Sequence, residues 1–264
     1  MKHYITIAFI ALLITGCGKD KKGTNDIEDM DAEPPVALAL ETKQYKATTS
    51  LPCKDKCPKV EIAVPVATGP QPTADSINKK VFNTVREIMY YGERPYEATN
   101  YDDLMASFIG SYEELKKEFP KEALEWEGKV TANVIRKTDS LINIELKHYT
   151  YTGGAHGYEG LRSLLFDPAT GHAFAYRDIF NDLNGFTDYA EKRFRGKHNI
   201  PDGQPINSTG FMFEDDTFKL PNTIFFMEDG LLLYYNTYEI SSYAEGPKEL
   251  LLPYSELTEY LKFK

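Results

Sequence analysis

The sequence predicts an α+β protein in which an antiparallel β-sheet, built from both halves of the chain, carries packed helices. Short stretches of alternating apolar and polar residues, bounded by turn residues, are typical of strands. Two longer stretches instead repeat their apolar residues at helical spacing. Aromatic residues make up 13% of the chain, with 18 Tyr and 15 Phe against a single Trp, and this bias favours β-rich packing.

Composition narrows the class of partner. The chain has 264 residues, of which 42% are hydrophobic, and a formal net charge of −10. Such a chain is globular, and its acidity argues against nucleic acid as a partner. It also argues against docking on anionic lipid through a basic patch. A basic protein partner is favoured electrostatically, although acidity alone serves equally well to keep a protein soluble.

The N-terminus carries a targeting pattern. Lys2 is followed by an apolar run over residues 4–14 and then by Gly16-Cys17. The run is too short to span a bilayer, which needs roughly 20 residues. The pattern resembles a bacterial lipoprotein signal, which implies removal of residues 1–16 and lipidation (palmitate) of Cys17. The alternative is a plain secretory signal with an accidental cysteine.

A lipid anchor at Cys17 implies a membrane protein of the cell envelope, facing the periplasm or the cell surface. Residues 17–44 are polar, then acidic, and include Pro34-Pro35. This segment has little to bury, so we expect a lipid-anchored, flexible tether. No apolar run of spanning length follows it.

The two remaining cysteines, Cys53 and Cys57, are separated by three residues. An even number of cysteines outside the cytoplasm predicts a disulfide. A metal half-site is an alternative, but no Cys or His partner lies nearby at zinc spacing. A redox pair is another, but such motifs usually have two intervening residues at a strand-to-helix junction.

The first half of the folded region, residues 45–145, is predicted as an α+β sub-region. Alternating apolar residues indicate its strands, and helical spacing behind a polar cap indicates its helices. In order, we expect a strand at 60–66, a helix from a cap at Asp75 to about residue 89, a helix at 101–119 limited by Pro120, and a hairpin of strands 129–136 and 142–151.

The second half, residues 146–264, is predicted as a C-terminal α+β sub-region that shares one core with the first. Short apolar runs separated by turns indicate most of its elements. We expect strands at 161–166 and 173–176, a helix capped by Asn184, short β runs at 211–213, 219–220, 223–227, 231–235 and 249–252, and a last short helix opening at Pro253.

Two motifs carry a resemblance to a known family. The first is Gly153-Gly154-Ala155-His156, and the second is the YEISSYAEGP stretch at 238–247. They resemble the extracellular module of lysozyme-sensing anti-sigma factors. A similar module, from a domain-of-unknown-function family, precedes some peptidoglycan deacetylase domains and occurs in uncharacterised envelope lipoproteins. The resemblance covers about residues 45–264 and is weak before residue 145.

The resemblance implies a binding module. In the sensors the module binds lysozyme, and a transmembrane helix relays that event inward. The present sequence shows no such helix, and no catalytic domain precedes its end at Lys264. We therefore expect capture of a ligand on a lipid anchor and not transcriptional signalling.

The first motif offers three candidate ligand-binding residues. Gly153 and Gly154 permit positive φ or close backbone approach, so their loop could meet a ligand; a tight turn between strands is the alternative. His156 could act as a base or metal ligand only with partners, and no other histidine lies at HxH or HxxxH spacing. A hydrogen bond within the loop is the alternative.

The second motif combines rings and carboxylates. Tyrosines are favoured anchors at protein interfaces, and an acidic rim suits a basic partner such as lysozyme. A packed loop that closes the sheet is the alternative. The candidate ligand-binding residues of this motif are Tyr238, Glu239, Tyr243, Glu245 and Pro247.

These observations predict a non-enzymatic envelope lipoprotein that binds a protein or a peptidoglycan-type ligand, with lysozyme as the concrete candidate. We assign no catalytic residue, cofactor or metal ligand, because no nucleophile motif or phosphate-binding loop is present. The alternatives are a peptidoglycan-modifying enzyme, with Glu239/Glu245 or Asp167/Asp178 as a carboxylate pair, and a structural or assembly lipoprotein.

Overall fold

A computed structural model describes residues 37–54, 56–89, 97–121 and 125–263. The predicted signal peptide, Cys17 and most of the predicted tether lie outside these residues. Residues 36–264 form one compact unit. Within the described part of the chain, no helix has the length and apolar character needed to cross a membrane.

A five-stranded sheet runs through the first part of this unit in the order β1-β2-β3-β4-β5. All neighbouring strands pair antiparallel except β2 and β3, which are parallel. The α+β class is therefore confirmed, but the sheet is mixed where we expected an antiparallel one. The strands are β1 (Ala39–Thr48), β2 (Lys59–Thr68), β3 (Glu127–Lys137), β4 (Ile142–Tyr151) and β5 (Tyr158–Phe166).

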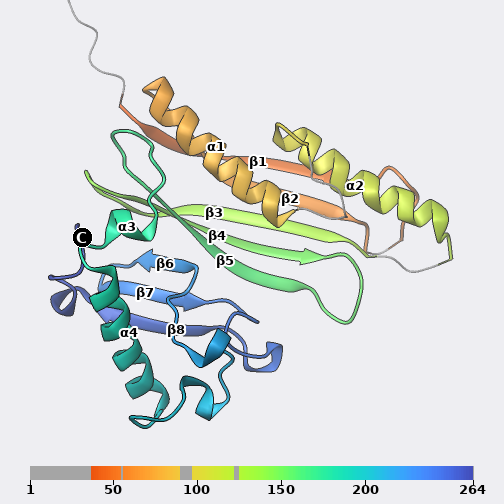
Figure 1. Cartoon of the computed structure of the whole chain (residues 1–264). Helices are drawn as coiled ribbons and strands as arrows, with labels where there is room; N and C mark the ends of the chain where they lie inside the picture. Colours follow the sequence, from red (N-terminus) through yellow and green to blue (C-terminus); the bar gives the residue numbers. More distant parts are fainter. Residues whose placement is uncertain (1–36, 55, 90–96, 122–124, 264) are drawn as a thin grey trace, which may run out of the picture. The chain divides into compact units, whose positions relative to one another are not determined.

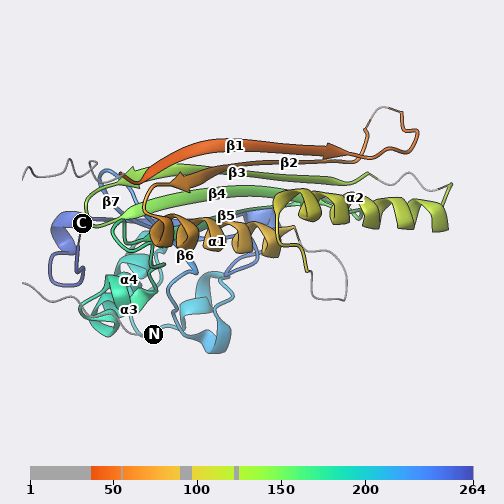
Figure 2. The same cartoon turned by 90° about the horizontal axis from the view of Figure 1, so that it is seen from above.

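Two helices explain the parallel pair. Helices α1 (Gln71–Ile88) and α2 (Tyr101–Glu118) lie between β2 and β3 in the chain, and a parallel pair needs such a crossover. Both helices cover the same face of the sheet (Figures 1 and 2). Helix α1 follows Pro70 directly and has a proline in its first turn, so it begins before the expected cap at Asp75.

The C-terminal part forms a second, three-stranded antiparallel sheet of β6 (Thr223–Phe226), β7 (Gly230–Tyr235) and β8 (Lys248–Pro253). Helix α3 (Tyr176–Ile179) and helix α4 (Leu183–His198) precede it. Helix α4 is capped by Asp182, which accepts from the Gly185 N–H, and not by Asn184. Short 3-10 helices lie at η1 (Ile206–Thr209), η2 (Glu214–Asp216), η3 (Tyr243–Glu245) and η4 (Tyr254–Glu256).

The buried apolar residues form two clusters, one under α1 and α2 and one around the small sheet. This corrects the expectation of one shared core. Strand alternation explains the division: on β5, Leu164 and Phe166 belong to the first cluster, whereas Leu165 between them belongs to the second. A strand in the middle of the unit thus serves both cores.

A buried asparagine joins the two sheets. The Asn143 Oδ1 on β4 accepts a hydrogen bond from the Phe226 N–H on β6 at 2.8 Å, and its Nδ2 donates to Ser163 Oγ on β5 at 2.8 Å. Strand β4 also crosses the expected boundary between residues 145 and 146. The two predicted sub-regions therefore share a strand.

Three local predictions are corrected. Strand β1 begins at Ala39, so residues 39–44, expected in the tether, belong to the sheet. Its sequence is polar because β1 is an edge strand whose side chains are mostly exposed. Residues 173–176 contribute only a single bridge between Ala173 and Phe166. Residues 211–213 and 219–220 form no strand; Phe213 instead packs its ring into the second core.

Candidate ligand-binding surface

Three of the predicted residues meet at the protein surface. The His156 and Tyr243 rings stack with centroids 3.8 Å apart and planes at 16°. The Tyr238 ring lies 5.8 Å from that of Tyr243. We call these three residues the aromatic surface. It joins the β4–β5 loop (152–157) to the β7–β8 loop (236–247), which are about 80 residues apart in sequence.

The β4–β5 loop owes its course to its glycines. Gly153 and Gly154 have φ of +108° and +94°, which side chains rarely allow. The Tyr151 hydroxyl donates to the Gly154 carbonyl at 3.0 Å and fixes the turn. The turn accounts for both glycines, and their role as ligand contacts stays a prediction.

His156 is exposed, and its Nδ1 lies 3.1 Å from the Gly157 carbonyl oxygen. The loop hydrogen bond expected as the alternative is therefore present. The face of the His156 ring stacks on the Tyr243 ring. In the part of the chain that the structure describes, no group of three or more His, Cys, Asp or Glu could hold a metal ion.

Tyr238 sits in a strained position. Its φ of +70° is left-handed, and its side chain is 55% exposed. A non-glycine residue there costs about 1 kcal/mol or more. The turn that imposes this conformation is closed by hydrogen bonds from Tyr238 N–H to the Ser241 carbonyl and from Glu239 N–H to the Asn236 carbonyl.

Glu239 has a structural position. Its carboxylate accepts from the Asn222 N–H and the Asn236 N–H, each at 2.9 Å. It anchors the turn below Tyr238, which agrees with the packed-loop alternative for this residue. Glu245 is exposed, pairs with Lys248 at 3.8 Å, and lies two residues from Tyr243 in the same loop; Pro247 ends that loop before β8.

The other carboxylate pair considered from the sequence, Asp167 and Asp178, also accepts hydrogen bonds from the backbone. Asp167 accepts from the Ala169 N–H at 2.7 Å and the Thr170 N–H at 3.2 Å. Asp178 accepts from the Ala175 N–H at the start of α3. That hydrogen bond, followed by the interaction with His172, lowers the pKa of Asp178. Asp167 therefore stabilises a turn, and Asp178 stabilises the start of α3.

Cys53 and Cys57 lie at disulfide distance, with their Cα atoms 5.6 Å apart. Cys57 also lines a groove at one end of the large sheet, whose other lining residues the sequence did not single out. They include three lysines and three glutamates, on β1, β2 and β3 or just before β2 and β3 begin. Their pattern becomes visible only once the strand pairing is known.

The fold and this surface define a two-sheet α+β module that presents a small cluster of rings on two loops. Residues 177–255 match the family model described as "Protein of unknown function (DUF3298)", and residues 52–159 match the model described as "Deacetylase PdaC". The family resemblance drawn from the two motifs is thereby confirmed. His156 lies in the second of these matched segments, and Tyr238 and Tyr243 lie in the first.

Solved structures share the fold. A DUF3298 family member from Bacteroides fragilis is 21% identical, with a TM-score of 0.65 over 86% of this chain and 95% of that one. A DUF3298 family protein from Pseudomonas aeruginosa is 20% identical, with a TM-score of 0.60 over 87% of this chain and 95% of that one. No curated protein matches the chain.

Proposed function

We propose that the protein is a non-enzymatic, lipid-anchored module of the cell envelope that captures a ligand through its aromatic surface. The observation that carries the proposal is the exposed stack of His156 on Tyr243. The matches to the DUF3298 and PdaC models suggest a domain related to the cell envelope. The predicted lipidation of Cys17 supports the same location.

The geometry suits recognition. Tyr243 is 45% exposed and Tyr238 is 55% exposed. Tyrosine offers a large, rigid contact area at low conformational cost, so it recurs at binding surfaces. The strain at Tyr238 points the same way, because strained backbone conformations cluster at functional sites.

Lysozyme is the first candidate ligand. The net charge of −10 attracts a strongly basic protein, and Glu245 adds a carboxylate in the same loop as Tyr243. Complementary charge raises the rate of encounter and favours the correct partner. The resemblance to lysozyme-sensing modules supports this choice.

A cell-wall glycan is the second candidate. The near-parallel rings of His156 and Tyr243 offer a flat aromatic edge and face, on which the C–H face of a sugar can pack. The name of the model matched by residues 52–159 includes a deacetylase. An enzyme acting on such a glycan is less well supported, because Glu239, Asp167 and Asp178 each hold backbone N–H groups.

Calorimetry with lysozyme at moderate salt tests the proposal. Tyr243→Ala should weaken binding by at least about tenfold, as expected for a central interface tyrosine. The matched control is Phe119→Ala, which removes an exposed ring at the end of α2 and should leave the affinity unchanged.

Absence of heat and of any shift in melting temperature at high lysozyme excess would exclude lysozyme. The same variants are then titrated with purified muropeptides, whose masses are measured after incubation. A mass change that disappears in His156→Ala would replace the binding proposal with an enzymatic one.

A further inference from the structure

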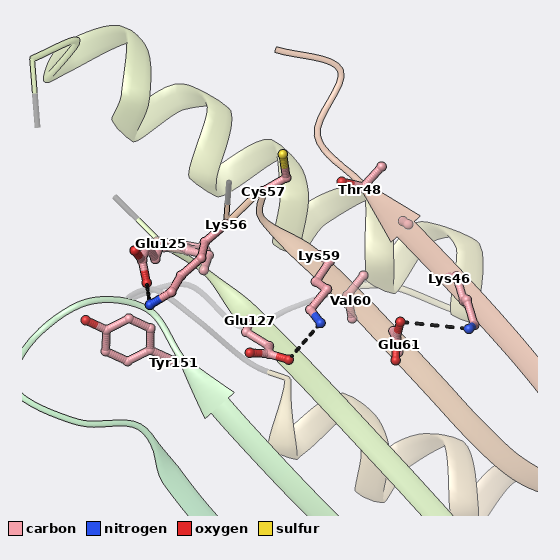
Figure 3. Close-up of a pocket in the computed structure, with 12 residues that line it drawn as sticks. Lys46, Thr48, Lys56, Cys57, Lys59, Val60, Glu61, Glu125, Glu127 and Tyr151 are labelled. Atoms are coloured by element: carbon pink, nitrogen blue, oxygen red, sulfur yellow. Dashed lines mark hydrogen bonds and ion pairs between the residues drawn. The ribbon is translucent and has the colours of Figure 1, made fainter. Parts of the chain in front are cut away.

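A groove of about 700 Å³ lies at the end of the large sheet where β2 and β3 begin and β4 ends (Figure 3). The groove and the aromatic surface have no residue in common. Its lining combines a charged row with the half-buried Tyr151 ring and Cys57 of the disulfide. The lining residues used below are Lys46, Lys56, Lys59, Glu61, Glu125, Glu127 and Tyr151.

The charges form a row of three ion pairs. Figure 3 shows two of them across neighbouring strands and the third, Lys56–Glu125, on the segments before β2 and β3, next to the Tyr151 ring. The numbers of lysines and glutamates are equal, so the row has no net charge. The pairs are Lys46–Glu61 at 3.8 Å, Lys59–Glu127 at 3.2 Å and Lys56–Glu125 at 3.1 Å.

Strand register fixes two of these pairs. Lys46 on β1 lies directly opposite Glu61 on β2, and Lys59 on β2 lies directly opposite Glu127 on β3. Lys59 and Glu61 are two residues apart on one strand, so they share a face about 7 Å apart. The groove therefore offers two sites, each with one positive and one negative group.

A charged group of a ligand can replace one partner of these exposed ion pairs. The Lys59 side chain is 48% exposed and that of Glu127 is 37% exposed. Exposed pairs contribute little to stability, so a ligand can replace one partner without disrupting the sheet. A polyanion is disfavoured, because each lysine of the row has a glutamate oxygen within 3.8 Å.

We propose that this groove binds a short zwitterionic peptide of two or three residues through its free ammonium and carboxylate groups. The ammonium group lies against Glu61 or Glu127, and the carboxylate lies against Lys46 or Lys59. An extended chain covers about 3.3–3.6 Å per residue, so two or three residues match the spacing of the two sites. Tyr151 supplies an apolar wall.

Titration of the whole folded protein with trialanine, followed by calorimetry and amide NMR shifts, tests this proposal. We expect saturable binding with a Kd below about 1 mM and shifts at groove residues. N-acetyl-trialanine amide, which has neither charge, should not bind. Lys59→Met with Glu127→Gln should weaken trialanine binding at least about tenfold.

The control is Lys147→Met with Glu159→Gln. This variant removes an ion pair of 2.7 Å between β4 and β5, outside the groove, and should leave the Kd within about twofold. Should the first variant fold poorly, Lys46→Met with Glu61→Gln serves the same purpose.

Lack of trialanine binding, or equal binding by the groove and control variants, would overturn the proposal. Tyr243→Ala should bind trialanine normally, so failure of the groove and failure of the aromatic surface are distinguishable.

Discussion

Asn236 acts as a strand neighbour for Leu161. Its Oδ1 accepts from the Leu161 N–H at 2.7 Å, and its Nδ2 donates to the Leu161 carbonyl at 3.0 Å. The side chain thus reproduces the two hydrogen bonds of an antiparallel pair at the edge of β5. Asn236 also opens the β7–β8 loop, so this contact positions the loop that carries Tyr238 and Tyr243.

Asn236→Ala should therefore lower the free energy of unfolding by about 2–4 kcal/mol, since it removes both hydrogen bonds to Leu161 and leaves the partly buried Leu161 N–H without its partner. Urea unfolding of the purified module measures the change. Asn133→Ala, at an exposed position of β3, should change it by no more than about 0.5 kcal/mol. A similar change in both variants would contradict this role for Asn236.

Tyr238→Gly should separate stability from binding. Glycine accepts the left-handed φ of +70° freely, so the free energy of unfolding should rise by up to about 1 kcal/mol. Ligand affinity should fall, because the exposed ring is lost. Asn199→Gly is the control, since Asn199 has a φ of 54° at the end of α4 and asparagine tolerates this region better. Destabilisation by Tyr238→Gly would show that the ring packs.

His148 should make stability depend on pH. The residue is 4% exposed, and its Nδ1 has no hydrogen-bond partner among the described residues. Burial, followed by the charge of Arg162, lowers the pKa of His148 to about 4, although Glu159 opposes the shift. The unfolded chain, with a pKa near its usual ~6.5, takes up the proton first. Stability should therefore be complete above about pH 6.5 and fall towards pH 4, by up to about 3 kcal/mol.

Urea unfolding between pH 7 and pH 4 measures this loss. His148→Leu should give a shallower decline, because it removes the group that titrates. His156→Gln, at an exposed position, should leave the decline unchanged. Identical pH profiles for the wild type and His148→Leu would assign the acid sensitivity to other groups.

The disulfide should contribute modestly. Only three residues separate Cys53 from Cys57, and a short loop restricts the unfolded chain little. Cys53→Ser with Cys57→Ser should lower the free energy of unfolding by about 2 kcal/mol or less. A reducing agent should have the same effect on the wild type and none on the variant. A larger loss would mean that the loop supports the groove wall.

Apolar spacing located the longer strands and helices that bury one face, but not the short runs at 173–176, 211–213 and 219–220. The hairpin of β3 and β4 and helix α2 lie within two residues of the predicted ranges. Strand β1 was missed because an exposed edge strand needs no apolar face. The parallel pairing of β2 with β3 was not predictable, since alternation specifies which face a residue occupies and not which strand lies beside it.

The candidate site was only partly predictable, because local sequence does not specify which segments lie side by side. The two motifs located the loops that carry His156 and Tyr243, but their stacking depends on how the small sheet attaches to β5. No local sequence pattern indicated the groove. Lys59 and Glu127 are ordinary residues for exposed strand positions, and only the register places them opposite each other.

The contact between Asn236 and Leu161 also covers part of an edge of the large sheet. An unpaired strand edge invites a strand from another chain. At β5, Asn236 and the Thr223 hydroxyl occupy the backbone groups of Leu161. At the opposite edge, β1 instead carries charged side chains, including Lys43 and Lys46. In the large sheet, hydrogen bonds occupy the Leu161 position of one edge and charged side chains line the other, and both features disfavour pairing with a strand of a neighbouring copy.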